Sequence, residues 1–196
     1  MGKSASGKDH FYRSLLENKD LSLKPFVIYT TRPMREGEVN GREYYFTDER
    51  HLGELRDAGK IIEERVYHTV NGPWYYFTAD DGNIDLSQER GENYLAIGTP
   101  ESFVPLRQYF GTERTLPIYI ETDDGIRLER AMKREKKQAN PDYAEMCRRF
   151  LADTEDFSEE NLARAGITRR FLNNGFYEDC LEEIADYVRT HTGTKT

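Results

Sequence analysis

Eight residues near the start of the chain have the types and spacing of a phosphate-binding loop. They are Gly2-Lys3-Ser4-Ala5-Ser6-Gly7-Lys8-Asp9. This G-x-x-x-x-G-K-D run differs at one position from the motif G-x-x-x-x-G-K-[ST]. Two glycines let backbone N–H groups turn toward one anion, and Lys8 and the N-terminus of a following helix add positive charge. The pattern predicts binding of a nucleoside triphosphate and, with it, phosphoryl transfer.

Asp9 stands where the motif has a hydroxyl group, and that hydroxyl normally contacts the Mg²⁺ of the bound nucleotide. Carboxylate oxygens are also Mg²⁺ ligands, so Asp9 is a candidate metal residue. The alternative is an acidic residue in the first helical turn that complements the helix dipole. The sequence leaves both interpretations open.

The composition limits the classes of protein to consider. The chain has 196 residues and a formal net charge of −8, with 37% hydrophobic and 33% charged residues. That length fits one domain with small insertions, and the acidic balance argues against a nucleic-acid binder. Cys147 and Cys180 show no disulfide or metal spacing, and no apolar run reaches about 18 residues. We therefore expect a reduced, cytoplasmic protein without a membrane partner.

Hydrophobic periodicity predicts strands and helices that alternate toward both ends of the chain. The expected helices cover 10–18, 51–58, 103–110, 125–138, a segment from 141 past 149, and 176–191. The expected strands cover 26–29, 42–46, 61–67, 74–78, 94–97, 116–120 and 167–173. Such alternation predicts an α/β fold with a parallel sheet. Hairpin signals in the middle of the chain, including a turn at Asn71-Gly72-Pro73, predict a small β-rich insertion.

A polar segment after the first predicted strand carries the most specific pattern. It reads Thr30-Thr31-Arg32-Pro33-Met34-Arg35-Glu36-Gly37-Glu38-Val39-Asn40-Gly41-Arg42-Glu43-Tyr44. This closely resembles the T-T-R-x-x-R-x-G-E-x-x-G-x-x-Y segment of guanylate kinases. The likeness continues in the expected order through Ile62-Glu63, Tyr75-Tyr76-Phe77-Thr78, Arg130, Arg134, Arg149 and Phe171-Leu172-Asn173.

The resemblance implies a P-loop NTPase fold, with three layers built around a parallel sheet. It implies a kinase core of residues 1–30 and 79–196, which includes a helical lid at about 125–150, and a GMP-binding β-rich insertion at 31–78. The family transfers a phosphoryl group from MgATP to GMP and yields ADP and GDP. The expected ligands are therefore ATP and a nucleoside monophosphate, with Mg²⁺, in a monomer or a homodimer.

The same resemblance assigns roles to individual residues. The clamp on the acceptor phosphate would be Arg32, Arg35, Tyr44 and Tyr76, and the base would be read by Glu63 and Thr78. ATP would lie on residues 2–9, with Asn173 near its adenine. Charge on the transferred phosphoryl group would be neutralised by Lys8, Arg32, Arg130, Arg134 and Arg149. These residue types suit the chemistry, because one guanidinium group can bind two phosphate oxygens at once. The acceptor phosphate is already anionic, so it needs no general base.

Each assignment competes with an ordinary structural interpretation. Arginines on charge-rich helices usually form a solvated face. Tyr44 and Tyr76 lie among other aromatic residues, and half of that set must pack in a core because strand side chains alternate between two faces. Glu63 could likewise lie on the solvent face of its strand.

Three features depart from the family pattern. The family has the sequence I-L-D-I-D where this chain has Tyr94-Leu95-Ala96-Ile97-Gly98. Ala96 and Gly98 therefore replace two carboxylates. Asp80, Asp81 or Asp85 could supply a replacement near the metal. Ile28 replaces a serine that contacts guanine in the family. The strand that normally precedes the phosphate loop is missing, so we expect either a natural start further upstream or another segment in its place.

These departures leave two alternatives to a GMP kinase. The first is a guanylate kinase-like binding module with weakened or absent catalysis. The second is a kinase of the same fold whose acceptor is another nucleotide or a phosphorylated small molecule.

Overall fold

The computed structural model describes residues 1–35, 37–69, 72–82 and 92–192. Its helices are α1 (Lys8–Glu17), α2 (Glu49–Asp57), α3 (Pro100–Phe110), α4 (Asp124–Glu135), α5 (Tyr143–Asp156), α6 (Glu159–Arg164) and α7 (Tyr177–Thr192), with short 3₁₀ turns η1 (Lys19–Leu21) and η3 (Thr112–Arg114). Its strands are β1 (Leu23–Pro25), β2 (Tyr29–Thr30), β3 (Tyr45–Phe46), β4 (Ile61–Thr69), β5 (Gly72–Ala79), β6 (Asn93–Leu95), β7 (Tyr119–Glu121) and β8 (Arg170–Leu172).

The strands form three separate sheets in the described part of the chain. β1 pairs with β6 and β7 pairs with β8, both in parallel, and a four-stranded sheet has the order β3-β2-β5-β4. The α/β class is therefore confirmed, but the described strands form no continuous parallel sheet. The backbone of Met1 lies along β7, since its carbonyl accepts a hydrogen bond from the amide of Ile120 at 3.0 Å.

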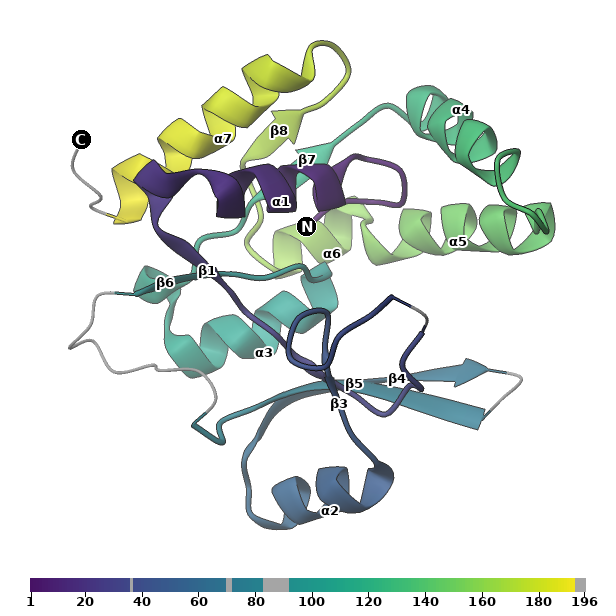
Figure 1. The fold of residues 1–196 in the computed structure, drawn as a ribbon. Coiled ribbons are helices and arrows are strands. Elements are labelled where there is room, and N and C mark those ends of the chain that lie inside the picture. Colours follow the sequence, from purple (N-terminus) through teal and green to yellow (C-terminus); the bar gives the residue numbers. More distant parts are fainter. Residues whose placement is uncertain (36, 70–71, 83–91, 193–196) are drawn as a thin grey trace.

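The two parallel pairs are covered by helices, as Figure 1 shows. Helices α1 and α7 pack on the β7–β8 pair through a cluster that includes Phe11, Ile120, Phe171 and Ile184, all buried. A second cluster joins β7 to the end of α5 and to α6, where the rings of Tyr119 and Phe157 stack at 5.7 Å. This packing fixes the ends of β7 and β8 beside the start of α1.

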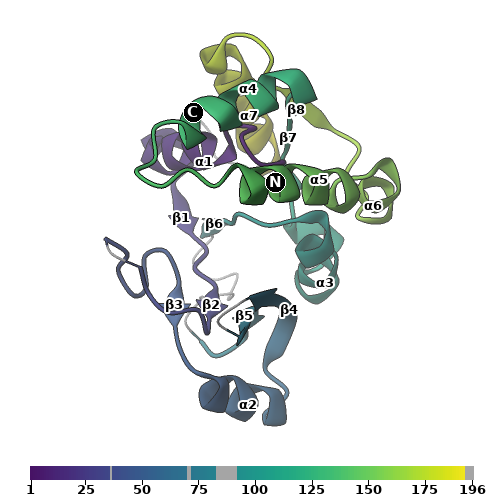
Figure 2. The ribbon, with the colours of Figure 1, turned by 90° about the vertical axis from the view of Figure 1, so that its right-hand side faces the viewer.

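The four-stranded sheet has its own core on one face. Tyr29, Leu52, Leu55 and Phe77 are buried there, so α2 packs against this face. Figures 1 and 2 place α2 and this sheet together at the end of the molecule away from α1 and α7, with α5 lying between α4 and this sheet. The opposite face carries Glu63, Tyr76 and Thr78, which were predicted to bind the acceptor nucleotide. We therefore call it the acceptor face.

Strand alternation decides which side chains lie on the acceptor face. Glu63 pairs with Thr78 and Arg65 pairs with Tyr76 across β4 and β5, while Glu64 pairs with the buried Phe77. Because neighbours along a strand point to opposite faces, the first four side chains share the face opposite α2.

Several predicted boundaries move in the structure. The predicted strand 26–29 is wrong, because pairing with β6 ends at Pro25 and pairing with β5 begins only at Tyr29. The predicted strand 42–46 shrinks to β3, since Arg42 and Glu43 form a turn. Helix α6 was not predicted, because its six residues are too few to show a helical period. The predicted turn at Asn71-Gly72-Pro73 lies partly outside the described residues, as Asp85 does entirely.

Within the described ranges, every helix is too short or too polar to cross a bilayer.

Substitution of Phe77 tests whether the packing of α2 on the sheet stabilises the strands that carry the acceptor face. Its ring is fully buried and stacks on Tyr29 at a centroid distance of 5.0 Å. Phe77→Ala is expected to lower the free energy of unfolding by about 3–5 kcal/mol, since it removes a large buried side chain. Val66→Ala on the neighbouring strand, where Val66 is 43% exposed, should change it by no more than about 0.5 kcal/mol. Urea unfolding measures both, and equal effects would contradict this account of the core.

Candidate nucleotide site

The glycine-cornered loop leads directly into α1. Gly7 lies before the first helical residue, with φ of 93°, and Ala5 has φ of 61°. The amides of His10 and Phe11 donate to the carbonyl of Gly7 at 2.9 and 3.2 Å, and the amides before them are the ones that a helix N-terminus can offer to an anion. A Cβ at Gly7 would lie 2.8 Å from Nδ2 of Asn173, which leaves no room for a side chain. The geometry is that of a nest of backbone amides suited to an anion.

Asn173 supports this loop from the end of β8. Its side-chain amide donates to the carbonyl of Ser6 at 2.8 Å, and its backbone amide donates to the carbonyl of Glu121 at 2.8 Å. The Asn173 side chain is buried. The structure therefore brings Asn173 to the loop, as a brace on its backbone; its predicted place near adenine stays a prediction.

Arg127 on α4 and Asp153 on α5 join these helices to the same loop, and sequence reasoning missed both residues. The Arg127 guanidinium is fully buried, donates to the carbonyl of Ser4 at 3.1 Å and lies 3.4 Å from the Asp153 carboxylate. Asp153 also accepts from the amide of Ser4 at 2.8 Å. Arg127 further pairs with Asp124 at 2.6 Å, which lowers the pKa of that carboxyl group. An arginine from α4 and a carboxylate from α5 thus hold the Ser4 backbone.

The predicted lid arginines lie in different surroundings. Arg130 is half-buried and donates to the carbonyl of Asn173 at 3.3 Å, next to the loop. Arg134 and Arg149 are exposed on α4 and α5. Arg130 is therefore positioned beside the loop in this arrangement, whereas Arg134 and Arg149 face solvent.

Arg32 is held on the insertion by a carboxylate that had no predicted role. Its side chain is buried and forms a two-pronged pair with Glu38, at 2.8 and 3.0 Å. The Arg32 guanidinium holds the pKa of Glu38 below its ordinary value of 4.5. Glu38 also accepts from the backbone amide of Arg35 at 2.7 Å, while the Arg35 side chain is exposed. The sequence could have indicated a role for Glu38, because this residue belongs to the segment that carries the family resemblance.

Tyr44 and Tyr76, which were predicted to bind the acceptor phosphate, come together next to Arg32. The Arg32 guanidinium lies 5.4 Å from the Tyr44 ring centre, and the Tyr44 and Tyr76 rings are 5.6 Å apart. Burial is the main cause that raises the pKa of Tyr44, and the Arg32 and Arg65 charges oppose it. The Tyr44 phenol therefore stays protonated near neutral pH and can donate a hydrogen bond.

Glu63 and Thr78 also come together, deeper on the acceptor face. The Thr78 hydroxyl donates to Oε1 of Glu63 at 2.9 Å, and both residues are buried. Arg65, which had no predicted role, donates to the same carboxylate from Nε at 3.0 Å. Alternation along β4 could have revealed this pair, since residues 63 and 65 share a face. Ile28, which replaces the family serine, is half-buried just before β2.

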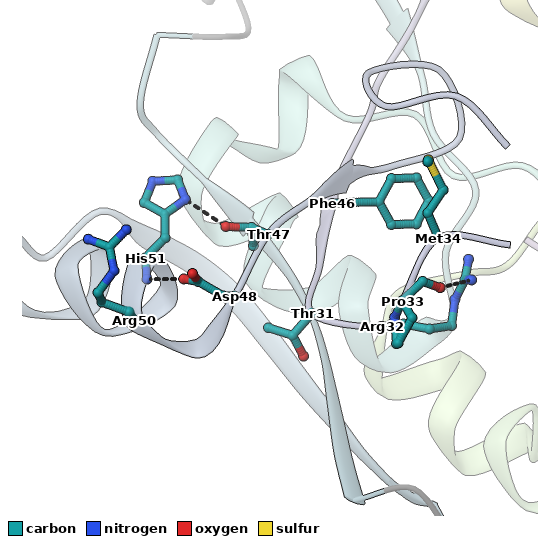
Figure 3. A pocket seen from close by; sticks show the side chains of 9 residues that line it. All are labelled: Thr31, Arg32, Pro33, Met34, Phe46, Thr47, Asp48, Arg50 and His51. Atoms are coloured by element: carbon teal, nitrogen blue, oxygen red, sulfur yellow. Dashed lines mark hydrogen bonds between the residues drawn. The ribbon is translucent and has the colours of Figure 1, made fainter.

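A hollow of about 460 Å³ opens near Arg32, and Figure 3 shows the nine side chains that line it. It runs from Met34 and Phe46 to the start of α2, where Thr47 lies 2.9 Å from Nδ1 of His51. Neither Glu63 nor Thr78 lines it. A second hollow, of about 310 Å³, lies where α3, α5 and α6 meet.

The described residues offer no ready-made metal cage. No three His, Cys, Asp or Glu side chains gather in the part of the chain that the structure describes. Asp9 is exposed in the first turn of α1, beside the loop. Tyr29 and Tyr109 donate hydrogen bonds to Asp81 and Asp80, respectively. Mg²⁺ commonly needs only one or two carboxylates besides nucleotide phosphates, so Asp9 fits that role.

Part of the chain is similar in sequence to known guanylate kinases. The sequence model of the guanylate kinase family matches residues 1–85. Guanylate kinase from Bordetella pertussis is 37% identical over 92 residues, which are 47% of this chain and 40% of that protein. Guanylate kinase from Aliivibrio fischeri is 38% identical over 88 residues, 42% of each chain. The aligned part thus spans about two fifths of the length of these curated relatives.

The fold extends the likeness along the chain. The crystal structure of guanylate kinase from Anaplasma phagocytophilum superposes with a TM-score of 0.62 and 20% identity, over 97% of this chain and 84% of that one. A mixed α/β fold with a glycine-cornered loop at the start of a helix defines the broad class. Within it, residues 1–85 of the chain are similar in sequence to the guanylate kinase family.

Substitution of Arg127 tests whether its buried contacts connect α4 and α5 to the loop. Arg127→Met is expected to lower the free energy of unfolding by about 3–5 kcal/mol, because it leaves the Asp153 carboxylate without its buried partner. Arg148→Met is the matched control, since Arg148 is 66% exposed and pairs with Glu145 within one helix. Its effect should be below about 1 kcal/mol. Denaturant unfolding compares them, and equal effects would show that the buried pair does not support the loop.

Proposed function

We propose that this protein is a nucleoside monophosphate kinase that transfers a phosphoryl group from MgATP to GMP. The observation that carries the proposal is the acceptor face, where buried Arg32 lies with Tyr44 and Tyr76, and buried Glu63 lies with Thr78. The first group has donors suited to a phosphate, and the second has an acceptor suited to a base. ATP would lie on the amide nest at residues 2–9.

The chemistry is the alignment of two anions that repel each other. The acceptor phosphate is already charged, so the protein needs to supply position and positive charge rather than a base. Lys8 and Arg130 supply that charge beside the loop, and Arg32 supplies it on the insertion. Arg134 and Arg149 are exposed, so in this proposal they turn toward the nucleotide when the lid closes.

Glu38 has a definite part in this proposal. Its pair with Arg32 keeps the guanidinium in one orientation before the ligand arrives. A preorganised donor costs less conformational entropy on binding. Asp9 and the nucleotide phosphates would hold Mg²⁺, and the ion would supply positive charge that offsets the charge of the phosphates.

The proposal includes the division into a kinase core of 1–30 and 79–196 and an insertion of 31–78. A binding module without catalysis is the alternative of a different class. It needs the acceptor face alone, and it gives no role to Lys8 or to the buried contacts of Arg127 and Asp153 with the loop. Calorimetry with ATP and GMP separately distinguishes the two, because a module would bind GMP without binding ATP.

Kinetics with a coupled ADP assay test the proposal directly. Arg32→Met is expected to raise the KM for GMP by about 10- to 150-fold, the cost of a lost hydrogen bond to a charged group. Lys8→Met should lower kcat instead, because Lys8 acts on the transferred phosphoryl group. Arg50→Met is the control, since Arg50 is 76% exposed on α2 and pairs with Glu54; its kinetics should match the parent protein. Absence of ADP release with every purine monophosphate would refute the proposal.

A further inference from the structure

The Arg65 guanidinium faces both carboxylate oxygens of Glu63, which are the atoms that a base would contact. Its Nε donates to Oε2 at 3.0 Å and its second nitrogen lies 3.5 Å from Oε1, so the guanidinium spans both oxygens. The Thr78 hydroxyl takes a further position on Oε1 at 2.9 Å. The side chains of Glu63 and Arg65 are only 2% and 12% exposed. This is a buried, nearly bidentate pair rather than a surface ion pair.

Arg65 also belongs to the acceptor face rather than to the sheet's core. It pairs across the strands with Tyr76, and its charge acts on Tyr44 in the same direction as that of Arg32. The face therefore holds two guanidinium groups, one beside the phosphate clamp and one on the base-reading carboxylate.

The pair changes what Glu63 can recognise. A free carboxylate accepts two parallel donors along the edge between its oxygens, as guanine N1–H and the exocyclic amine would require. With Arg65 on that edge and Thr78 on Oε1, the outer side of Oε2 remains as an acceptor. One donor of a base can bind there, but a second parallel donor cannot.

We propose that Arg65 is a specificity-determining residue that removes discrimination for the exocyclic amine. The acceptor class is then the 6-oxopurine nucleoside monophosphates, with or without an amine at position 2, because the ring N1–H alone is read. This inference rests on the proposed function, since it places the acceptor base at Glu63.

Calorimetric titration of the full chain with GMP and with inosine monophosphate tests it at pH 8. The parent protein is expected to bind both with dissociation constants within about threefold of each other. Arg65→Met frees the carboxylate edge, so GMP should bind at least about tenfold more tightly than inosine monophosphate. Thermal unfolding of each variant confirms folding, and Arg65→Gln provides a second, polar replacement.

Arg56→Met is the matched control. Arg56 pairs with Glu64, the next residue along β4, on the opposite face of the sheet. Arg56→Met removes an arginine partner, located on α2, from a glutamate of the same strand. It should leave the ratio of the GMP and inosine monophosphate affinities unchanged.

Two outcomes overturn the inference, and they differ. A preference of about tenfold or more for GMP in the parent protein that is unchanged in both Arg65 variants would show that Arg65 does not control base reading, and would leave the proposed kinase intact. Failure of both monophosphates to bind any variant, while MgATP still binds, would refute the acceptor site itself and the inference with it.

Discussion

Buried arginine–carboxylate pairing is the constraint on which this structure depends. A guanidinium group that is shielded from water needs a partner, because an unpaired buried charge is costly. The chain solves this three times, with Arg32 on Glu38, Arg65 on Glu63 and Arg127 on Asp153. Each pair holds a cation in one position, and the Arg127–Asp153 pair also links α4 to α5.

These pairs divide between the two halves of the proposed site. Arg127 and Asp153 bind the Ser4 backbone to α4 and α5, so the loop and these two helices are coupled through shared hydrogen bonds. Arg32 and Arg65 lie on the acceptor face, where the α2 core beneath β5 fixes the strand register. Because register decides which side chains reach that face, the apolar packing on one side of the sheet sets the chemistry on the other.

The sequence predicted the parts of the site that local patterns encode. The loop follows from motif spacing, whereas the grouping of Arg32 with Tyr44 and Tyr76, and of Glu63 with Thr78, was expected from the family resemblance. The fragmented sheet and the shift of the strand at 26–29 depend on pairing with distant segments, which no local pattern reports. Arg127 could not be found, because an arginine in a charge-rich helix is usually solvated, and its burial arises only when α4 and α5 pack on the loop.

The central claim is that an acceptor nucleotide binds on the face of the β3-β2-β5-β4 sheet that lies opposite α2. Nitrogen-15 NMR of the labelled full chain during titration with GMP measures this most directly. The account predicts that the largest amide shifts fall on Arg32, Glu63, Tyr76 and Thr78. Largest shifts at His51 and along α2, with those four amides unmoved, would contradict it.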